Sequence, residues 1–142
     1  MSKYEFELFA DYYQFYIQDD NTELGDLSDA WTEDAVENLL AVSNGVVGIG
    51  TVRNMDVTVQ IVVQTTPPNL NEPEFDRINK TSIDCSTGTL VIAGCTDYFP
   101  DAERIALVPG VYGVTIGYKN LNDVSEDGLD GNDSYHIWLY DE

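Results

Sequence analysis

The fold expected for this chain depends on one stretch, Trp31-Thr32-Glu33-Asp34-Ala35-Val36-Glu37-Asn38-Leu39-Leu40-Ala41-Val42-Ser43-Asn44-Gly45. Four apolar residues in it have the spacing that forms one face of an α-helix: Ala35, Val36, Leu39 and Leu40. Thr32 is a suitable N-cap, because its hydroxyl can accept a hydrogen bond from the first turn, and Trp31 can pack back onto that turn. Gly45 can adopt the left-handed conformation that ends a helix. We therefore predict a helix near residues 32–43.

The sequence on both sides of this helix alternates apolar and polar residues, as half-buried β-strands do. Strands are expected at residues 4–8, 46–52, 55–64, 81–85, 89–93, 104–108, 111–118 and 134–140, with residues 13–17 as a further strand or a bulged continuation of the first. Tight turns are expected at Arg53-Asn54, at residues 86–88 in a hairpin, and at Pro109-Gly110 between two strands. The Pro-rich residues 65–80 are expected to form a surface connection. About eight strands with one α-helix predict a mainly β fold, an antiparallel β-sandwich that residues 1–142 form as a single domain.

The net charge of the chain is unusually large, because 26 Asp and Glu against six Lys and Arg give −20. Such a charge repels nucleic acid and anionic membranes, and it attracts basic partners. No stretch is long enough to span a membrane and the first residues do not resemble a secretory leader, so we expect a soluble cytoplasmic protein. In that reducing compartment Cys85 and Cys95 are expected to be free thiols.

The acidic residues are concentrated in two segments that contain no Lys or Arg. Of the 26 acids, eight lie in residues 19–37 and seven in residues 120–142. A general adaptation to solubility or to a salty habitat would explain the total charge but not this concentration. If the two segments meet at one end of the sandwich, their field can steer a basic partner. The partner-binding residues predicted on this basis are Asp19, Asp20, Glu23, Asp26, Asp29, Asp123, Glu126, Asp127, Asp130 and Asp133.

Few residues of the sequence suit catalysis. His136 is the single histidine and lies within a predicted strand, so any nucleophile–histidine pair would have to use it. The glycines of residues 45–50 are not followed by the Lys of a phosphate-binding loop, and the two cysteines lack the spacing of a metal site. We therefore predict no enzymatic activity and no cofactor.

The loop at residues 123–133 supports an alternative function. Its Asp and Glu side chains supply hard oxygen ligands on a glycine-containing loop, which suits Ca²⁺. The loop does not follow the ligand spacing of an EF-hand. The alternative is therefore a calcium-binding or lectin-like β-sandwich module that uses this loop.

Several motifs occur in an order that is typical of one known family. They are Tyr13-Gln14-Phe15 on an early strand, Trp31-Thr32-Glu33-Asp34-Ala35-Val36-Glu37 at the helix start, Gly45 before a strand, Arg53-Asn54 before the next, Val108-Pro109-Gly110-Val111-Tyr112, and the closing strand at 134–140. In this order the chain resembles the competence protein J family, although its two acidic loops and its Pro-rich connection are longer. The resemblance implies a small acidic inhibitor that binds a DNA-degrading nuclease associated with DNA uptake. It implies no catalytic residues.

Charge and resemblance together predict a non-catalytic protein that blocks a basic nuclease, or another nucleic-acid-binding protein, by occupying its cationic cleft. Direct binding to nucleic acid or to a membrane is not expected, because both are anionic. Carboxylates at the edge of the contact would mainly speed association. An aromatic anchor such as Trp138 would carry more of the affinity.

Overall fold

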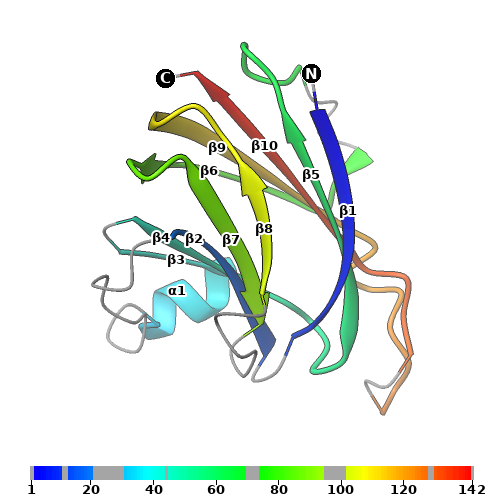
Figure 1. The fold of residues 1–142 in the computed structure, drawn as a ribbon. Helices are drawn as coiled ribbons and strands as arrows, with labels where there is room; N and C mark the ends of the chain where they lie inside the picture. Colours follow the sequence, from blue (N-terminus) through cyan, green and yellow to red (C-terminus); the bar gives the residue numbers. More distant parts are fainter. Residues whose placement is uncertain are drawn as a thin grey trace.

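The computed structural model describes residues 2–10, 13–20, 31–43, 45–69, 74–94, 102–127 and 130–141. In these ranges the chain forms ten strands and one short helix, arranged as two layers of sheet (Figure 1). The elements are β1 (Ser2–Phe9), β2 (Gln14–Asp19), α1 (Glu33–Asn38), β3 (Leu40–Ser43), β4 (Val46–Gly50), β5 (Asp56–Val63), β6 (Arg77–Cys85), β7 (Thr89–Gly94), β8 (Glu103–Ala106), β9 (Gly110–Lys119) and β10 (Ser134–Asp141).

Each layer is a sheet of five strands. Sheet A has the order β1-β5-β10-β9-β6, and sheet B has the order β3-β4-β2-β7-β8. Neighbouring strands are antiparallel, except that β10 runs parallel to β5, with Ile137 beside Ile61. The mainly β sandwich predicted from the sequence is therefore confirmed, with ten strands instead of about eight and one parallel pair in the middle of sheet A.

The core lies between the two sheets, because alternate residues of each strand point inward. Aromatic rings join the layers there. Phe15 of β2 meets the ring of Tyr135 of β10 edge-on with centroids 5.9 Å apart, and Tyr118 of β9 meets Tyr135 at 5.8 Å. All three side chains are fully buried, and the Phe15–Tyr135 contact crosses from sheet B to sheet A. Cys85 is a buried free thiol whose pKa is raised to about 12, first by burial and then by Asp19.

The predicted helix is correct at its start and wrong at its end. Ala35 N donates to Thr32 Oγ1 over 3.2 Å, so Thr32 is the N-cap. The helix ends at Asn38, because Leu39 takes the left-handed conformation with a φ of 59°. The residues that follow belong to β3, which pairs with β4. Gly45, with a φ of 72°, lies between β3 and β4 and not at the helix end.

Two of the predicted turns connect different sheets. The turn at residues 86–88 leads from β6 in sheet A to β7 in sheet B, so the predicted hairpin is wrong. Pro109-Gly110 likewise leads from β8 in sheet B to β9 in sheet A. The predicted surface connection at residues 65–80 ends earlier than expected, because β6 begins at Arg77. Within the described part of the chain, no helix is long and apolar enough to cross a membrane.

Candidate partner-binding surface

One end of the sandwich carries α1, the connection 51–55 and the connection 120–133, and we call it the helix end (lower half of Figure 1). Tyr118 OH, near the end of β9, donates to Leu39 O over 2.6 Å and so joins α1 to the strand that leads into the connection 120–133. Thr51 N donates to Tyr13 O over 2.9 Å, which joins β4 to the start of β2. These bonds hold the end of α1 against sheet A and the end of β4 against the start of β2.

A buried ion pair fixes the connection 120–133 to the connection 51–55. Arg53 Nε lies 2.5 Å from Asp133 Oδ1, and the two side chains are only 9% and 0% exposed. Tyr135 OH donates to Asp133 Oδ2 over 2.7 Å and accepts from Val52 N over 3.0 Å. Burial raises the pKa of Tyr135 above its usual range, so its hydroxyl keeps its proton and donates. Because both charges are paired away from water, this end of the connection has one fixed position.

The exposed part of the connection 120–133 is folded by its own hydrogen bonds. Ser125 N donates to Asp130 O over 2.7 Å, and Asn132 N donates to Asp123 O over 2.9 Å. Ser125 Oγ donates to Asp127 Oδ1 over 2.6 Å. These bonds hold four exposed acidic side chains at the helix end: Asp123, Glu126, Asp127 and Asp130.

Helix α1 adds a second group of carboxylates at the same end. Glu33, Asp34 and Glu37 are exposed, and the last turn of the helix contains no basic residue. Asn79 Nδ2 donates to Asn38 O over 2.8 Å, so the end of the helix is tied to β6. These three acids lie in the acidic segment 19–37 but were not among the predicted site residues. They could have been predicted from the sequence, because acidic residues that follow a helix N-cap and lie off the apolar face are usually exposed.

The predicted site residues do not form one group. Asp123, Glu126, Asp127 and Asp130 are exposed at the helix end, whereas Asp133 is 2% exposed and paired with Arg53. Asp19 and Asp20 lie at the opposite end of β2, where Asp20 N donates to Thr89 O over 3.0 Å. Glu23, Asp26 and Asp29 lie outside the described residues.

Asp19 is an internal structural carboxylate. It is 2% exposed and accepts hydrogen bonds from Ser86 Oγ and from both the backbone N and the Oγ1 of Thr87. Burial alone would raise its pKa, but these hydrogen bonds outweigh burial and the pKa is lowered. Asp20 pairs with Arg104 at 3.4 Å. The carboxylates of Asp19 and Asp133 are therefore already bonded inside the fold and do not face a partner.

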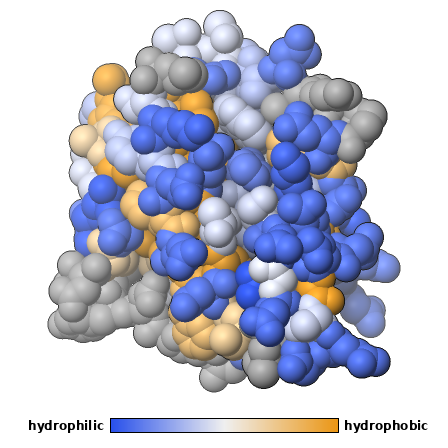
Figure 2. Space-filling view, turned by 90° about the vertical axis from the view of Figure 1, so that its right-hand side faces the viewer, coloured by the Kyte–Doolittle hydropathy of each residue, from blue (hydrophilic) through white to orange (hydrophobic). Residues whose placement is uncertain are grey.

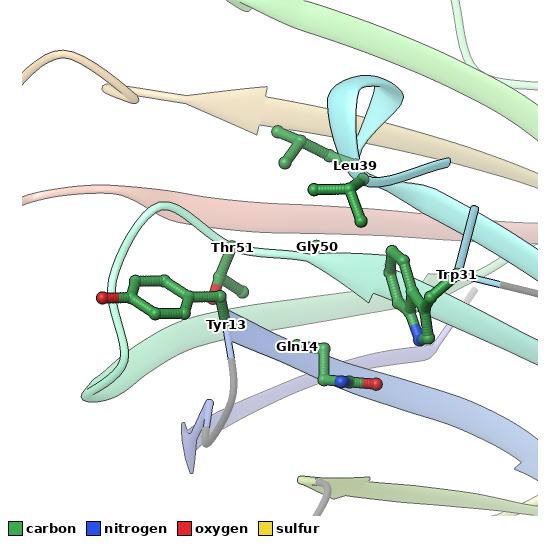
Figure 3. Close-up of a pocket in the computed structure, with 7 residues that line it drawn as sticks. Tyr13, Gln14, Trp31, Leu39, Gly50 and Thr51 are labelled. Atoms are coloured by element: carbon green, nitrogen blue, oxygen red, sulfur yellow. The ribbon is translucent and has the colours of Figure 1, made fainter. Parts of the chain in front are cut away.

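A pocket lies between α1 and the edge of sheet B at the helix end (Figure 3). It has a volume of about 560 Å³ and is lined by Tyr13, Gln14, Trp31, Val36, Leu39, Gly50 and Thr51. Such a volume is within the usual range of ligand pockets, ~300–1,000 Å³. Most of its lining is apolar, whereas the exposed side chains of α1 include the carboxylates of Glu33, Asp34 and Glu37.

A second, polar recess of about 460 Å³ lies between β1, β5 and the connection 120–133. Its lining includes Glu7, Asp56 and Asp130. Among the described residues, no group of three His, Cys, Asp or Glu side chains has the arrangement that would hold a metal ion. In the described part of the loop at 123–133, Asp123 Oδ2 accepts from Asn132 Nδ2 over 2.9 Å and Asp127 Oδ1 accepts from Ser125 Oγ over 2.6 Å.

Ser134 at the edge of this recess lies beside the single histidine. Ser134 Oγ and His136 Nε2 are 2.9 Å apart, and His136 Nδ1 lies 3.2 Å from Gln60 Oε1. Burial lowers the pKa of His136, so the imidazole is neutral near pH 7. A serine and a neutral histidine at this distance can form a nucleophile–base pair. The neighbouring carboxylates of the recess oppose the negative charge of an oxyanion, so the arrangement is poorly suited to acyl transfer.

Hydrophilic side chains cover most of the side of the molecule that faces the viewer in Figure 2, and hydrophobic ones show only in small areas between them. This distribution fits the high net charge of the chain. The largest exposed apolar side chains include Tyr13 at 57% and Val36 at 58%, and both line the pocket beside α1. The helix end therefore combines exposed carboxylates with an exposed apolar pocket.

No protein-family model matches the sequence, and no curated protein matches it either. Two solved structures share the fold. One is ComJ from Bacillus subtilis, described as an inhibitor of the DNA-degrading activity of NucA, with a TM-score of 0.73, 15% identity, and coverage of 100% of this chain and 96% of that one. The other is described as crocagin biosynthetic gene J, with a TM-score of 0.62, 16% identity, and coverage of 97% of this chain and 98% of that one. The expected resemblance is thus confirmed at the level of the fold.

Proposed function

We propose that this chain, which has the fold of ComJ, binds a DNA-degrading nuclease in the cytoplasm and blocks it without catalysing a reaction. The observation that carries the proposal is the helix end, where two separate segments present exposed carboxylates at the same end of the sandwich. These are Glu33, Asp34 and Glu37 of α1, and Asp123, Glu126, Asp127 and Asp130 of the connection 120–133.

The charge of DNA explains why such a surface would inhibit a nuclease. Duplex DNA carries one negative charge per ~1.7 Å of its axis, so an enzyme that grips it needs a cationic cleft. Carboxylates held on a folded surface can take the places of phosphates in that cleft. The Arg53–Asp133 pair and the bonds within the connection 120–133 hold the backbone of this connection in place. Binding therefore loses less conformational entropy than binding through an unfolded loop would. Glu23, Asp26 and Asp29 remain proposed partner-binding residues on the basis of sequence alone, whereas Asp20 lies at the opposite end of β2 and pairs with Arg104.

The proposal is tested by neutralising one set of carboxylates. The variant is Asp123→Asn, Glu126→Gln, Asp127→Asn and Asp130→Asn in one chain. Its control changes the net charge equally at exposed acids outside α1 and the connection 120–133, with Glu5→Gln, Asp84→Asn, Glu103→Gln and Asp141→Asn. NucA is the nuclease assayed, by DNA degradation and by association kinetics at several salt concentrations.

We expect the first variant to associate ~10-fold or more slowly and with a flatter salt dependence, because steering depends on charges at the contact. The control should associate within about twofold of the unmodified chain, because distant charges are screened beyond ~10 Å at 0.1 M salt. Equal losses in the two variants would show that total charge and not the helix end steers binding. Failure of the unmodified chain to slow DNA degradation would overturn the inhibitor assignment for this nuclease.

A further inference from the structure

Trp31, which lines the pocket beside α1, has an indole N–H whose hydrogen bond is not made within the described residues. Trp31 Nε1 is shielded from solvent, and none of the described residues accepts a hydrogen bond from it. A buried donor without a partner is unfavourable, since it has lost its bond to water and gained none. In Figure 3 the Trp31 indole stands at one side of the pocket and Tyr13 stands at the other side. A small turn of the indole would present its N–H to a group bound in the pocket.

The backbone around this pocket holds two left-handed residues. Tyr13 and Leu39, with φ values of 60° and 59°, both line it. Non-glycine residues adopt this conformation rarely and keep it only where the surroundings impose it. Leu39 also lies directly on the backbone of Gly50, because a Cβ there would come within 2.9 Å of Leu39 Cα. The main chain on this side of the pocket is therefore closely packed.

The charge around the pocket selects its occupant. Val36 forms part of the wall, and the same short helix carries the exposed carboxylates of Glu33, Asp34 and Glu37. A cationic segment is attracted there, whereas a second copy of this chain, with a net charge of −20, is repelled. The apolar wall requires an apolar side chain from the same segment.

We infer that this pocket receives an apolar side chain of a cationic segment of the nuclease, and that Trp31 turns its indole N–H onto a backbone carbonyl of that segment. The inference rests on the proposed function and adds the residue that anchors it. Trp31, and not Trp138, is the aromatic anchor. The exposed carboxylates then set the rate of association, and the pocket sets the rate of dissociation.

The test uses short peptides with the full chain labelled with ¹⁵N. The probe is acetyl-Lys-Leu-Lys-amide, and the controls are acetyl-Lys-Gly-Lys-amide and acetyl-Glu-Leu-Glu-amide. The two tryptophans give two indole N–H signals, which Trp138→Phe assigns. We expect the Lys-Leu-Lys peptide to shift the Trp31 signal downfield and saturably, with the Trp138 signal unchanged. Each control should require at least about tenfold higher concentration for the same shift, Lys-Gly-Lys because it lacks the apolar side chain and Glu-Leu-Glu because its charge is repelled.

Two exposed valines give a matched pair of variants. Val36 lines the pocket, while Val42 on β3 is 46% exposed and does not line it. Val36→Ser should weaken peptide binding about tenfold and speed dissociation from the nuclease without changing the salt dependence of association. Val42→Ser should change neither. Because both side chains are exposed, neither variant is expected to affect folding.

Failure of the inference and failure of the proposed function give different results. If Lys-Leu-Lys leaves the Trp31 signal unchanged, or if either control peptide binds equally well, the inference is wrong even when the chain inhibits NucA. If Val36→Ser and Val42→Ser behave alike, the pocket is not the anchor. If the peptide binds as expected but DNA degradation is not slowed, the pocket stands and the nuclease assignment falls.

Discussion

Asp130 and Asp133 are three residues apart and both line the polar recess at the helix end, yet their surroundings are opposite. Asp130 is exposed, whereas Asp133 is sealed against Arg53 and Tyr135. A carboxylate in the first position is available to a partner, and one in the second position holds the fold together. The sequence pattern around them does not distinguish the two, because burial depends on Arg53, which lies 80 residues away.

The Arg53–Asp133 pair gives the first prediction. Asp133→Asn leaves the Arg53 guanidinium buried without its counter-charge, which typically costs ~3–5 kcal/mol of unfolding free energy. Urea unfolding followed by tryptophan fluorescence measures this loss. Asp130→Asn is the matched control and should stay within about 0.5 kcal/mol of the unmodified chain, as exposed substitutions usually do. Similar losses in the two variants would contradict a structural role specific to Asp133.

Asp19 gives a prediction about pH. Its pKa is lowered from 3.8 because the hydrogen bonds from Thr87 and Ser86 outweigh its burial. A carboxylate whose pKa is lower in the folded state stabilises the fold above 3.8, and this contribution is lost as the pH falls through the lowered value. Thr87→Val removes one of these bonds. The stability difference between the unmodified chain and Thr87→Val should therefore be largest well above pH 3.8 and shrink toward lower pH.

Urea unfolding at a series of pH values checks this dependence. Thr65→Val, at an exposed position, is the control and should give a difference that does not vary with pH. A Thr87→Val difference that stays constant across the same range would mean that Thr87 does not stabilise the charged form of Asp19.

At the scale of elements, Phe75 in the segment before β6 packs against Gly117 of sheet A. A Cβ on Gly117 of β9 would lie 2.7 Å from Phe75 Cδ1, so the ring rests directly on the backbone. Phe75 also meets His136 and Trp138 of β10 edge-on, with centroids 5.7 and 5.8 Å away. Phe75 thus holds the segment before β6 against β9 and β10.

Gly117→Ala should displace the Phe75 ring and cost ~1–3 kcal/mol of unfolding free energy, as overpacking does. The penalty is measured by urea unfolding in two backgrounds, the unmodified chain and Phe75→Ala. In the Phe75→Ala background it should nearly vanish, because the ring that the new methyl group meets is gone. The same penalty in both backgrounds would show that Gly117 is required for a reason other than this contact.

The elements also show where local sequence was informative. Thr32 as N-cap and the alternation of residues 134–140 were predicted correctly, since both depend on neighbours a few residues away. The end of α1 was not predicted, because the apolar run after Asn38 suits a helix as well as a strand. Pairing with β4 decides between them. The turns at 86–88 and 109–110 were recognised, but which sheet each strand joins depends on long-range pairing.

At the scale of the whole molecule, a net charge of −20 acts against the compact state through self-repulsion. The Debye length falls from ~30 Å at 0.01 M salt to ~8 Å at 0.15 M, so added NaCl screens this repulsion. The melting temperature at neutral pH should therefore rise over that range. Near the isoelectric point of about 4.1 the same addition should have little effect, which serves as the control. A melting temperature that is insensitive to NaCl at neutral pH would contradict destabilisation by charge.

The candidate site was predicted in part at this scale. The concentration of acids in two segments was visible in the sequence, and exposed carboxylates of both segments do lie at the helix end. The particular residues were less predictable. Asp19 and Asp133 are buried, and the pocket beside α1 is built from residues of β2, α1 and β4 that no sequence pattern connects. Only the folded arrangement brings Tyr13, Trp31 and Val36 together.

The position of β10 has a consequence for how the chain is made. Residues 134–141 leave the ribosome after the other strands that the structure describes, yet they occupy the middle of sheet A, between β5 and β9. Until they emerge, the β1–β5 and β6–β9 pairs are separate halves with unpaired edges, and such edges pair readily with other chains. Translation that stops before residue 134 would therefore yield a product that aggregates rather than a folded sandwich.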